Sequence, residues 1–349
     1  MAVSNYLYRK VARKVLSESL DLKKGETLTV ESWNNGLDFA RIIVAEARAL
    51  GATAVLLLED EEAYMEGVSR APRDSLGKMG RNEYEMLQAT DAYVFVPGPL
   101  LAAYQTRVNP KLMSDSTRYN RSWYEAAEKA KLRGARLTFG YVGEEMAGVA
   151  GKTIQEVVEG QLRAALVDFG EISRVAKRIS SLLADGAEAE LRSGESRLQF
   201  RLKGKATVED GVVSSADVKS GDNVTYVPPG MVSIDVEPAS ASGTVKVSKT
   251  LTRLGLLQDA QLTFGNGRLT KWKSRNDMEM LNELVSSVPE EGRRLLGLNV
   301  GVNPKMGYLL WQDRMVAGSV TAAGFGFTPV FRGADLTVGG KQVVRGGKL

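Results

Sequence analysis

One stretch does most to decide the fold of this chain: LLGLNVGVNPKMGYLLWQDRMVAGSVTAAGFGFTPVF, residues 295–331. Its only charged residues are Lys305, Asp313 and Arg314, and glycines recur along its whole length. A surface loop is rarely this apolar, and an ordinary helix would be weakened by so many glycines. The stretch therefore predicts buried strands and tight turns, at a place where the backbone and a ligand can approach closely.

Upstream, residues 1–184 alternate between helical and strand patterns. Apolar residues recur at helical spacing over residues 6–20 and again over 37–50, where Gly51 ends the second helix. The run AVLLL at residues 54–58 is typical of a strand buried on both faces. Further strands are predicted at residues 27–30, 91–96 and 136–141. This order implies right-handed crossovers and an open, mostly parallel sheet.

The pattern changes after residue 184. From Asp185-Gly186 to Val245 the residues alternate between apolar and polar, with frequent glycine and serine, which predicts antiparallel strands. One helix is predicted at residues 277–288, and a hairpin with Gly339-Gly340 at its turn is predicted at 336–344. We therefore predict an α/β N-terminal domain (1–184) and a mostly antiparallel β, or α+β, C-terminal domain (185–349).

The absence of two residue types restricts the chemistry of the chain. Its 349 residues include no cysteine and no histidine. Thiolate nucleophiles, zinc–sulfur sites, Ser-His-Asp triads and histidine-ligated metals are excluded on that ground. Carboxylate chemistry, lysine chemistry or no catalysis at all remain.

Charge and hydropathy indicate an ordinary soluble globular protein. The 46 basic and 42 acidic residues are well mixed along the chain, which argues against a nucleic-acid partner. No run of 18 apolar residues is present, so we expect no membrane span. The first fifteen residues lack the apolar core of a secretory leader, so we expect a cytoplasmic protein. The lack of thermolabile cysteine also suits a thermophilic chain.

Several segments, taken in order, resemble the thermophilic aminopeptidase T family of metallopeptidases, family M29. KKGE at residues 23–26 lies between a predicted helix and strand, as at the opening of that family, and YVGEEMAGVAG at 141–151 is similar to its Met-Ala stretch. VPPGMVSIDVEPASASGTV at 227–245 is similar to its N-x-P-x-G-E-V and S-A-x-G-T-V motifs. Residues 295–304 are similar to the segment ending in G-x-N-P, and DRMVAGSVTAA at 313–323 is similar to D-E-K-x-x-G-T-x-H-x-A. The resemblance spans nearly the whole chain and implies an aminopeptidase T-like fold.

The resemblance also implies a pair of divalent metals held by Glu and His in the second domain. The motif positions that would carry these ligands fall on residues without the required groups: Met231, Gly297, Thr321, Phe331 and Gly333. Thioether, hydroxyl and hydrocarbon side chains bind zinc or manganese poorly. We therefore expect no metal cofactor and no catalytic residue, and a self-associating or ligand-binding scaffold, a pseudoenzyme.

Two other interpretations stay open. In the first, the chain is a metal-dependent aminopeptidase that releases N-terminal residues, with two divalent metals on relocated carboxylates; the nearest candidates are Asp235, Glu237, Asp313 and Asp335. In the second, a metal-free enzyme binds an anion through Lys305, Arg314, Thr321 and Arg332. The expected cleft residues are Asp235, Glu237, Asp313 and Arg332. Because members of the family are homodimers, we also expect a homodimer or larger homo-oligomer, with a peptide or small molecule as ligand.

Overall fold

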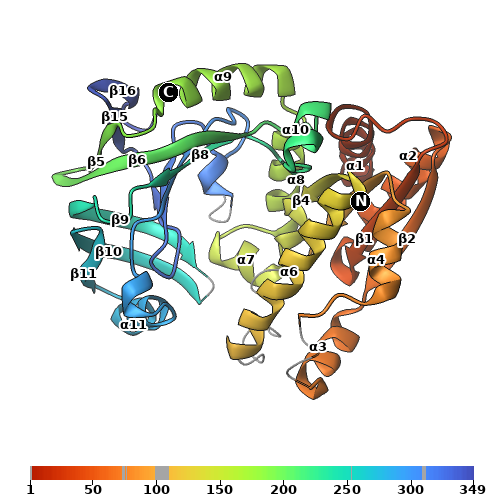
Figure 1. Cartoon of the computed structure of the whole chain (residues 1–349), viewed down its shortest axis with the longest axis horizontal. Coiled ribbons are helices and arrows are strands. Elements are labelled where there is room, and N and C mark those ends of the chain that lie inside the picture. Colours follow the sequence, from red (N-terminus) through yellow and green to blue (C-terminus); the bar gives the residue numbers. More distant parts are fainter. Residues whose placement is uncertain (1, 73–74, 76, 99–109, 253, 309–311) are drawn as a thin grey trace. The chain divides into compact units, whose positions relative to one another are not determined.

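The structure is a computed structural model that describes residues 2–72, 75, 77–98, 110–252, 254–308 and 312–349 (Figure 1). The chain forms two compact units. Unit 1 contains residues 1–166 and 211–228, and unit 2 contains 167–210 and 229–349. The division therefore differs from a single boundary at residue 184, because the chain leaves unit 1 after helix α8 and returns to it for one short segment.

Unit 1 is built on a five-stranded sheet in the order β2-β1-β3-β4-β7, with every neighbouring pair parallel. Its strands are β1 (Thr27–Trp33), β2 (Thr53–Glu59), β3 (Ala92–Val96), β4 (Arg133–Leu137) and β7 (Val224–Val227). Its helices are α1 (Ala2–Lys14), α2 (Leu37–Ala49), α3 (Glu61–Arg70), α4 (Arg81–Gln88), α6 (Pro110–Ala130), α7 (Glu144–Val149), α8 (Ile154–Ala165) and α10 (Ser215–Ser220). The predicted open parallel sheet with helices is confirmed.

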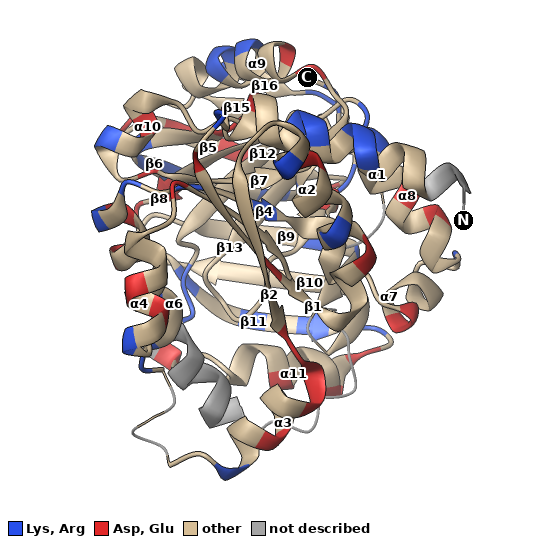
Figure 2. Ribbon diagram, turned by 90° about the vertical axis from the view of Figure 1, so that its right-hand side faces the viewer, with Lys and Arg blue, Asp and Glu red and all other residues tan. Residues whose placement is uncertain are grey.

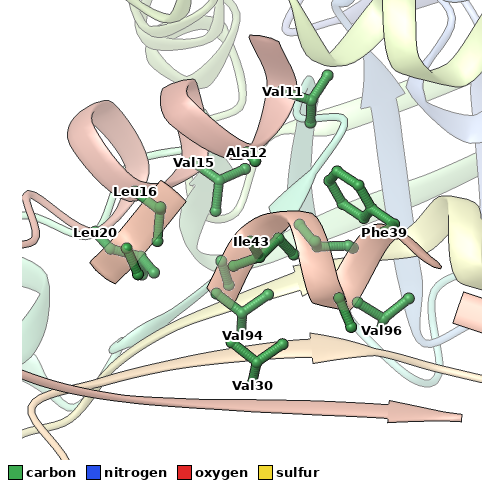
Figure 3. Close-up of a cluster of buried hydrophobic side chains, with 14 of the residues drawn as sticks. Val11, Ala12, Val15, Leu16, Leu20, Val30, Phe39, Ile43, Val94 and Val96 are labelled. Atoms are coloured by element: carbon green, nitrogen blue, oxygen red, sulfur yellow. The ribbon is translucent and has the colours of Figure 1, made fainter. Parts of the chain in front are cut away.

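Two helices cover one face of this sheet because their apolar residues follow the helical period. Val11, Val15 and Leu16 of α1 and the π-helical turn after it point toward Phe39 and Ile43 of α2 (Figure 3). Beneath them lie Val30, Val94 and Val96 of the strands. On the other face, Tyr93 packs with Leu87 of α4 and Ala127 of α6. Burial of each large aliphatic side chain here contributes about 1.5–3 kcal/mol to stability.

The position of β2 corrects the expectation that AVLLL is buried on both faces. β2 is the edge strand, and Val55, Leu56, Leu57 and Leu58 are 51, 37, 39 and 46 % exposed. The helices that cover the sheet leave these side chains open. A continuous apolar run indicates a strand, but it does not distinguish a central strand from an edge strand.

Residues 211–228 give a second correction, because we expected them to continue the antiparallel domain. Instead they form α10 and then β7, which pairs in parallel with β4 at the far edge of the sheet of unit 1. The strand predicted at 136–141 is also displaced, since β4 ends at Leu137 and a short 3-10 helix follows.

Unit 2 is a mostly antiparallel sheet with two α-helices among its described residues, α9 (Phe169–Leu182) and α11 (Met278–Ser286). The main path of the sheet runs β11-β10-β9-β6-β8-β12-β13-β14, and β5, β15 and β16 branch from it. The strands are β5 (Glu188–Ser193), β6 (Ser196–Glu209), β8 (Met231–Val236), β9 (Ser242–Thr252), β10 (Gly255–Gly265), β11 (Arg268–Ser274), β12 (Gly297–Gly301), β13 (Val320–Ala323), β14 (Val330–Phe331), β15 (Asp335–Val338) and β16 (Lys341–Val344). The predicted antiparallel domain and its C-terminal hairpin, β15–β16, are confirmed.

The stretch at residues 295–331 forms buried strands and tight turns, as predicted. It supplies β12, β13 and β14, whose pairings are antiparallel and whose residues are mostly buried. Gly318 has φ +82°, and a Cβ there would lie 2.0 Å from the carbonyl oxygen of Gly347. Residues 309–311 of the stretch lie outside the described residues. Among the helices that the structure describes, none is long and apolar enough to cross a membrane.

Candidate functional site

The sheet of unit 2 brings together several positions that the resemblance assigns to metal ligands. Met231 of β8 lies opposite Gly301 of β12, and Gly297 lies opposite Asp235. Thr321 of β13 lies opposite Asn299. Because antiparallel partners share a face and alternate residues of a strand do too, Met231, Gly297 and Thr321 all lie on one face of the sheet.

The remaining assigned positions lie elsewhere. Phe331 pairs with Val320, the neighbour of Thr321, so its side chain lies on the opposite face, where it is fully buried. Gly333 follows β14 in a turn with φ +67°. Strand pairing therefore places three of the five positions on one face of the sheet and Phe331 in the hydrophobic core.

The three assigned positions on this face carry neutral groups, and the hydroxyl of Thr321 already has a hydrogen-bond partner. Thr321 is fully buried, and its Oγ1 accepts a hydrogen bond of 2.8 Å from Asn299 Nδ2. Met231 is half-buried and lies opposite Glu209 of β6. Glu209 is a carboxylate that the sequence patterns did not single out, and a bulge in β6 between Lys203 and Thr207 sets its register. The assigned positions offer no anionic ligand.

The carboxylates proposed as relocated ligands do not cluster among the described residues, although Asp235, the partner of Gly297, lies on this face. Asp235 is exposed, and Glu237 lies 3.8 Å from Lys203 Nζ. Asp335 Oδ1 accepts a hydrogen bond of 2.6 Å from the backbone N–H of Gly346. Within the described ranges, no three His, Cys, Asp or Glu residues lie together in a way that could hold a metal ion.

Asp313 has a partner of its own. It lies in the 3-10 turn Asp313–Met315, its side chain is only 2 % exposed, and Arg332 Nη2 donates a hydrogen bond to its Oδ2. The guanidinium of Arg332 lies 4.2 Å from the centre of the Tyr308 ring. Burial raises the pKa of the Tyr308 hydroxyl. The ion pair thus links the 3-10 turn Asp313–Met315 to the residue that follows β14.

Two of the groups considered for an anion-binding enzyme already have hydrogen-bond partners, and a third lies exposed on a turn. Arg332 is held by Asp313, and the hydroxyl of Thr321 is held by Asn299. Lys305 lies exposed on the turn that follows β12. That turn is fixed by the buried Asn303, whose side chain accepts from the Lys305 N–H at 2.9 Å.

The two units define a class of structure, a parallel α/β unit joined to a mostly antiparallel β unit. The solved structure of wild-type AmpT from Thermus thermophilus has this fold, with a TM-score of 0.69, 15 % sequence identity and coverage of 98 % of both chains. No protein-family model matches the sequence. No curated protein matches it either. The similarity to AmpT therefore shows a shared fold, and it leaves the chemistry to the residues of this chain.

Proposed function

We propose that this chain is an aminopeptidase T-like scaffold without a metal pair or peptidase activity, and that it acts through self-association and ligand binding. The observation that carries the proposal is the filling of the assigned ligand positions. Met231 offers a thioether, Thr321 is bonded to Asn299, and Phe331 is buried in the core.

The residues present do not fit two divalent ions. Two metals about 3.5–4 Å apart need several anionic or imidazole ligands to offset their charge. The face that carries Met231 and Thr321 offers Glu209 and Asp235 at most, on different strands and at different registers.

The metal content of the purified protein tests the proposal directly. Elemental mass spectrometry is carried out before and after incubation with zinc, manganese and cobalt, and hydrolysis of aminoacyl-p-nitroanilides is measured in parallel. We expect metal far below one equivalent per chain and no metal-dependent hydrolysis. Two tightly held metals with metal-dependent hydrolysis that Asp235→Asn or Asp313→Asn abolishes would establish the relocated-ligand aminopeptidase instead.

The self-association part of the proposal is supported by the edge strand β2. Residues 53–58 carry no charge, and Glu59 at the end of the strand is its first charged residue (Figure 2). Natural edge strands are usually protected from pairing by lysine, proline or a bulge, none of which is present in β2. Its four exposed apolar residues therefore favour a covering partner.

The strand is complementary to a second copy of itself. Thr53 N–H donates to the carbonyl oxygen of Glu26, just before β1, and β2 continues in parallel register with β1 from Thr53. Because alternate residues of a strand direct their backbone groups to opposite sides, Ala54, Leu56 and Leu58 direct theirs outward. An antiparallel pair centred on Leu56 places Ala54 opposite Leu58 of the other copy and Glu59 opposite Thr53. Outward-facing groups then meet each other and the two glutamates stay apart. Arg48 donates to the Ala54 carbonyl at 3.0 Å, and that oxygen has a second lone pair for the partner.

Light scattering after size exclusion tests this interface. We expect the wild type at twice the 37.8 kDa chain mass and Leu56→Lys at the chain mass, because two lysines would meet at the twofold axis. Ile154→Lys, at another exposed apolar residue of unit 1, is the matched control and should stay dimeric. A monomeric wild type, or a dimeric Leu56→Lys that keeps its circular dichroism, would exclude β2 as the interface.

A further inference from the structure

Unit 1 contains a pocket of about 90 Å³ on the sheet face that α6 covers. Its lining includes Glu31 of β1, Phe95 of β3, Arg136 of β4 and, from α6, Tyr119, Trp123 and Tyr124. The lining extends across β1, β3 and β4 on this face and reaches Val224, the first residue of β7.

Two opposite charges lie in one row across the floor of this pocket. Glu31 pairs in register with Phe95, and Phe95 pairs with Arg136. Two strand spacings place the carboxylate and guanidinium residues about 9–10 Å apart at their backbones. The guanidinium of Arg136 is 4.8 Å from the centre of the Phe95 ring. The aromatic ring therefore separates an anion from a cation.

Both charged groups keep hydrogen-bonding capacity. The hydroxyl of Tyr93 donates to one oxygen of Glu31, a residue that lines the pocket, and a carboxylate can accept hydrogen bonds at both oxygens. Nε of Arg136 is buried and has no hydrogen-bond partner within the described ranges. A buried unpaired donor is costly, by about 1–3 kcal/mol, so an acceptor that reaches it is favoured.

We propose that this pocket binds a small zwitterion, an amino-carboxylate in which Arg136 holds the carboxylate and Glu31 holds the ammonium. A simple anion would meet Glu31, and a simple cation would meet Arg136, whereas a zwitterion matches both. The rings of Tyr119 and Trp123 also line the pocket, and an ammonium is attracted to aromatic rings, whereas Tyr124 forms a side-chain hydrogen bond with Arg136. A pocket of about 90 Å³ holds a solute of roughly six non-hydrogen atoms, the size of L-alanine.

The environment of Glu31 gives this binding a pH dependence. The pKa of Glu31 is raised to about 7, chiefly by burial and in smaller part by Glu83 of α4 and Glu59 of β2, while the Tyr93 hydrogen bond and Arg136 oppose the rise. Tyr119 of α6 also faces this group, and its hydroxyl donates to Glu83. Because an ammonium needs the ionised carboxylate, affinity should be greater at pH 8 than at pH 6.

This proposal rests on the ligand-binding part of the proposed function and gives it a location. It does not depend on the metal content of the protein or on the β2 interface. Calorimetry at pH 8 with three small probes that differ in charge tests it on the wild type: L-alanine, propionate and ethylammonium. A ligand of this size is expected to bind in the millimolar range. We expect L-alanine to bind at least tenfold more tightly than either probe that lacks one charge.

Substitutions at Glu31 and Arg136 then test whether each charged side chain contributes to L-alanine binding. Glu31→Gln and Arg136→Gln should each weaken L-alanine binding at least tenfold, whereas Arg121→Gln and Glu125→Gln, an exposed ion pair on α6, should not change it. The wild-type probe comparison stays decisive even if a pocket variant unfolds. Equal affinity for all three probes, no binding of L-alanine, or undiminished binding in folded Glu31→Gln would overturn the proposal. The metal and light-scattering measurements are unaffected by any of these results.

Discussion

Replacing Glu31 by Gln should change the pH dependence of stability in a defined direction. Burial carries the pKa of Glu31 from its ordinary value of 4.5 to about 7 in the folded chain. Between these values the folded state holds a proton that the unfolded state has lost, so the stabilising contribution is complete below pH 4.5. It is lost as pH rises through 7. At 1.36 kcal/mol per pH unit, the loss is about 3 kcal/mol.

Glu31→Gln keeps the shape of the side chain and an oxygen that can accept from Tyr93, but it does not titrate. The free energy of unfolding is measured by urea titration at pH 5, 6, 7 and 8 for the wild type and the variant. We expect the variant to gain about 2.5 kcal/mol relative to the wild type between pH 5 and pH 8, because the contributions of other carboxylates largely cancel in the difference.

Tryptophan fluorescence reports on this region, since Trp123 lines the same pocket. Glu125→Gln, an exposed carboxylate of α6, is the matched control and should track the wild type at every pH. Parallel curves for Glu31→Gln and the wild type would show that Glu31 titrates normally, and the reasoning from burial would then be wrong.

Further substitutions test the packing of each unit. Asp313→Ala should destabilise unit 2 by about 3 kcal/mol, because it leaves the partly buried guanidinium of Arg332 unpaired, whereas Asp235→Ala, on an exposed carboxylate, should stay within about 0.5 kcal/mol of the wild type by urea titration. Gly301→Ala should cost about 1–3 kcal/mol, since its Cβ would lie 2.2 Å from the carbonyl oxygen of Val316. Gly148→Ala, in helix α7 with no atom within 4 Å of the new Cβ, should instead raise the thermal midpoint and add about 0.5–1 kcal/mol; a loss there would contradict the helix geometry.

The positions assigned by resemblance show which features of the candidate site a sequence motif can predict. Met231, Gly297 and Thr321 can be placed on one face once the strands are paired, and the sequence alone supplied the motifs that contain them. Phe331 lies on the other face because it pairs with Val320 and not with Thr321. A shift of one residue in strand register reverses the face, and a sequence motif does not specify register. The contacts that occupy Thr321 and Asp313 come from Asn299 and Arg332, which lie 22 and 19 residues away.

The sequence by itself determined the local elements, the fold class and the inventory of chemistry. Hydrophobic periodicity specified the alternating helices and strands of residues 1–184, and the glycine-rich apolar run specified the buried turns of 295–331, because these signals act over neighbouring residues. The lack of histidine and cysteine excluded whole mechanisms without any coordinates.

Only the tertiary structure decided which strands lie at the edges of a sheet and which charges meet. The exposure of β2, the return of residues 211–228 to unit 1 and the row formed by Glu31, Phe95 and Arg136 all depend on strand pairing between distant segments. Strand order and register are fixed by the sum of many long-range contacts, so no single stretch of sequence carries them.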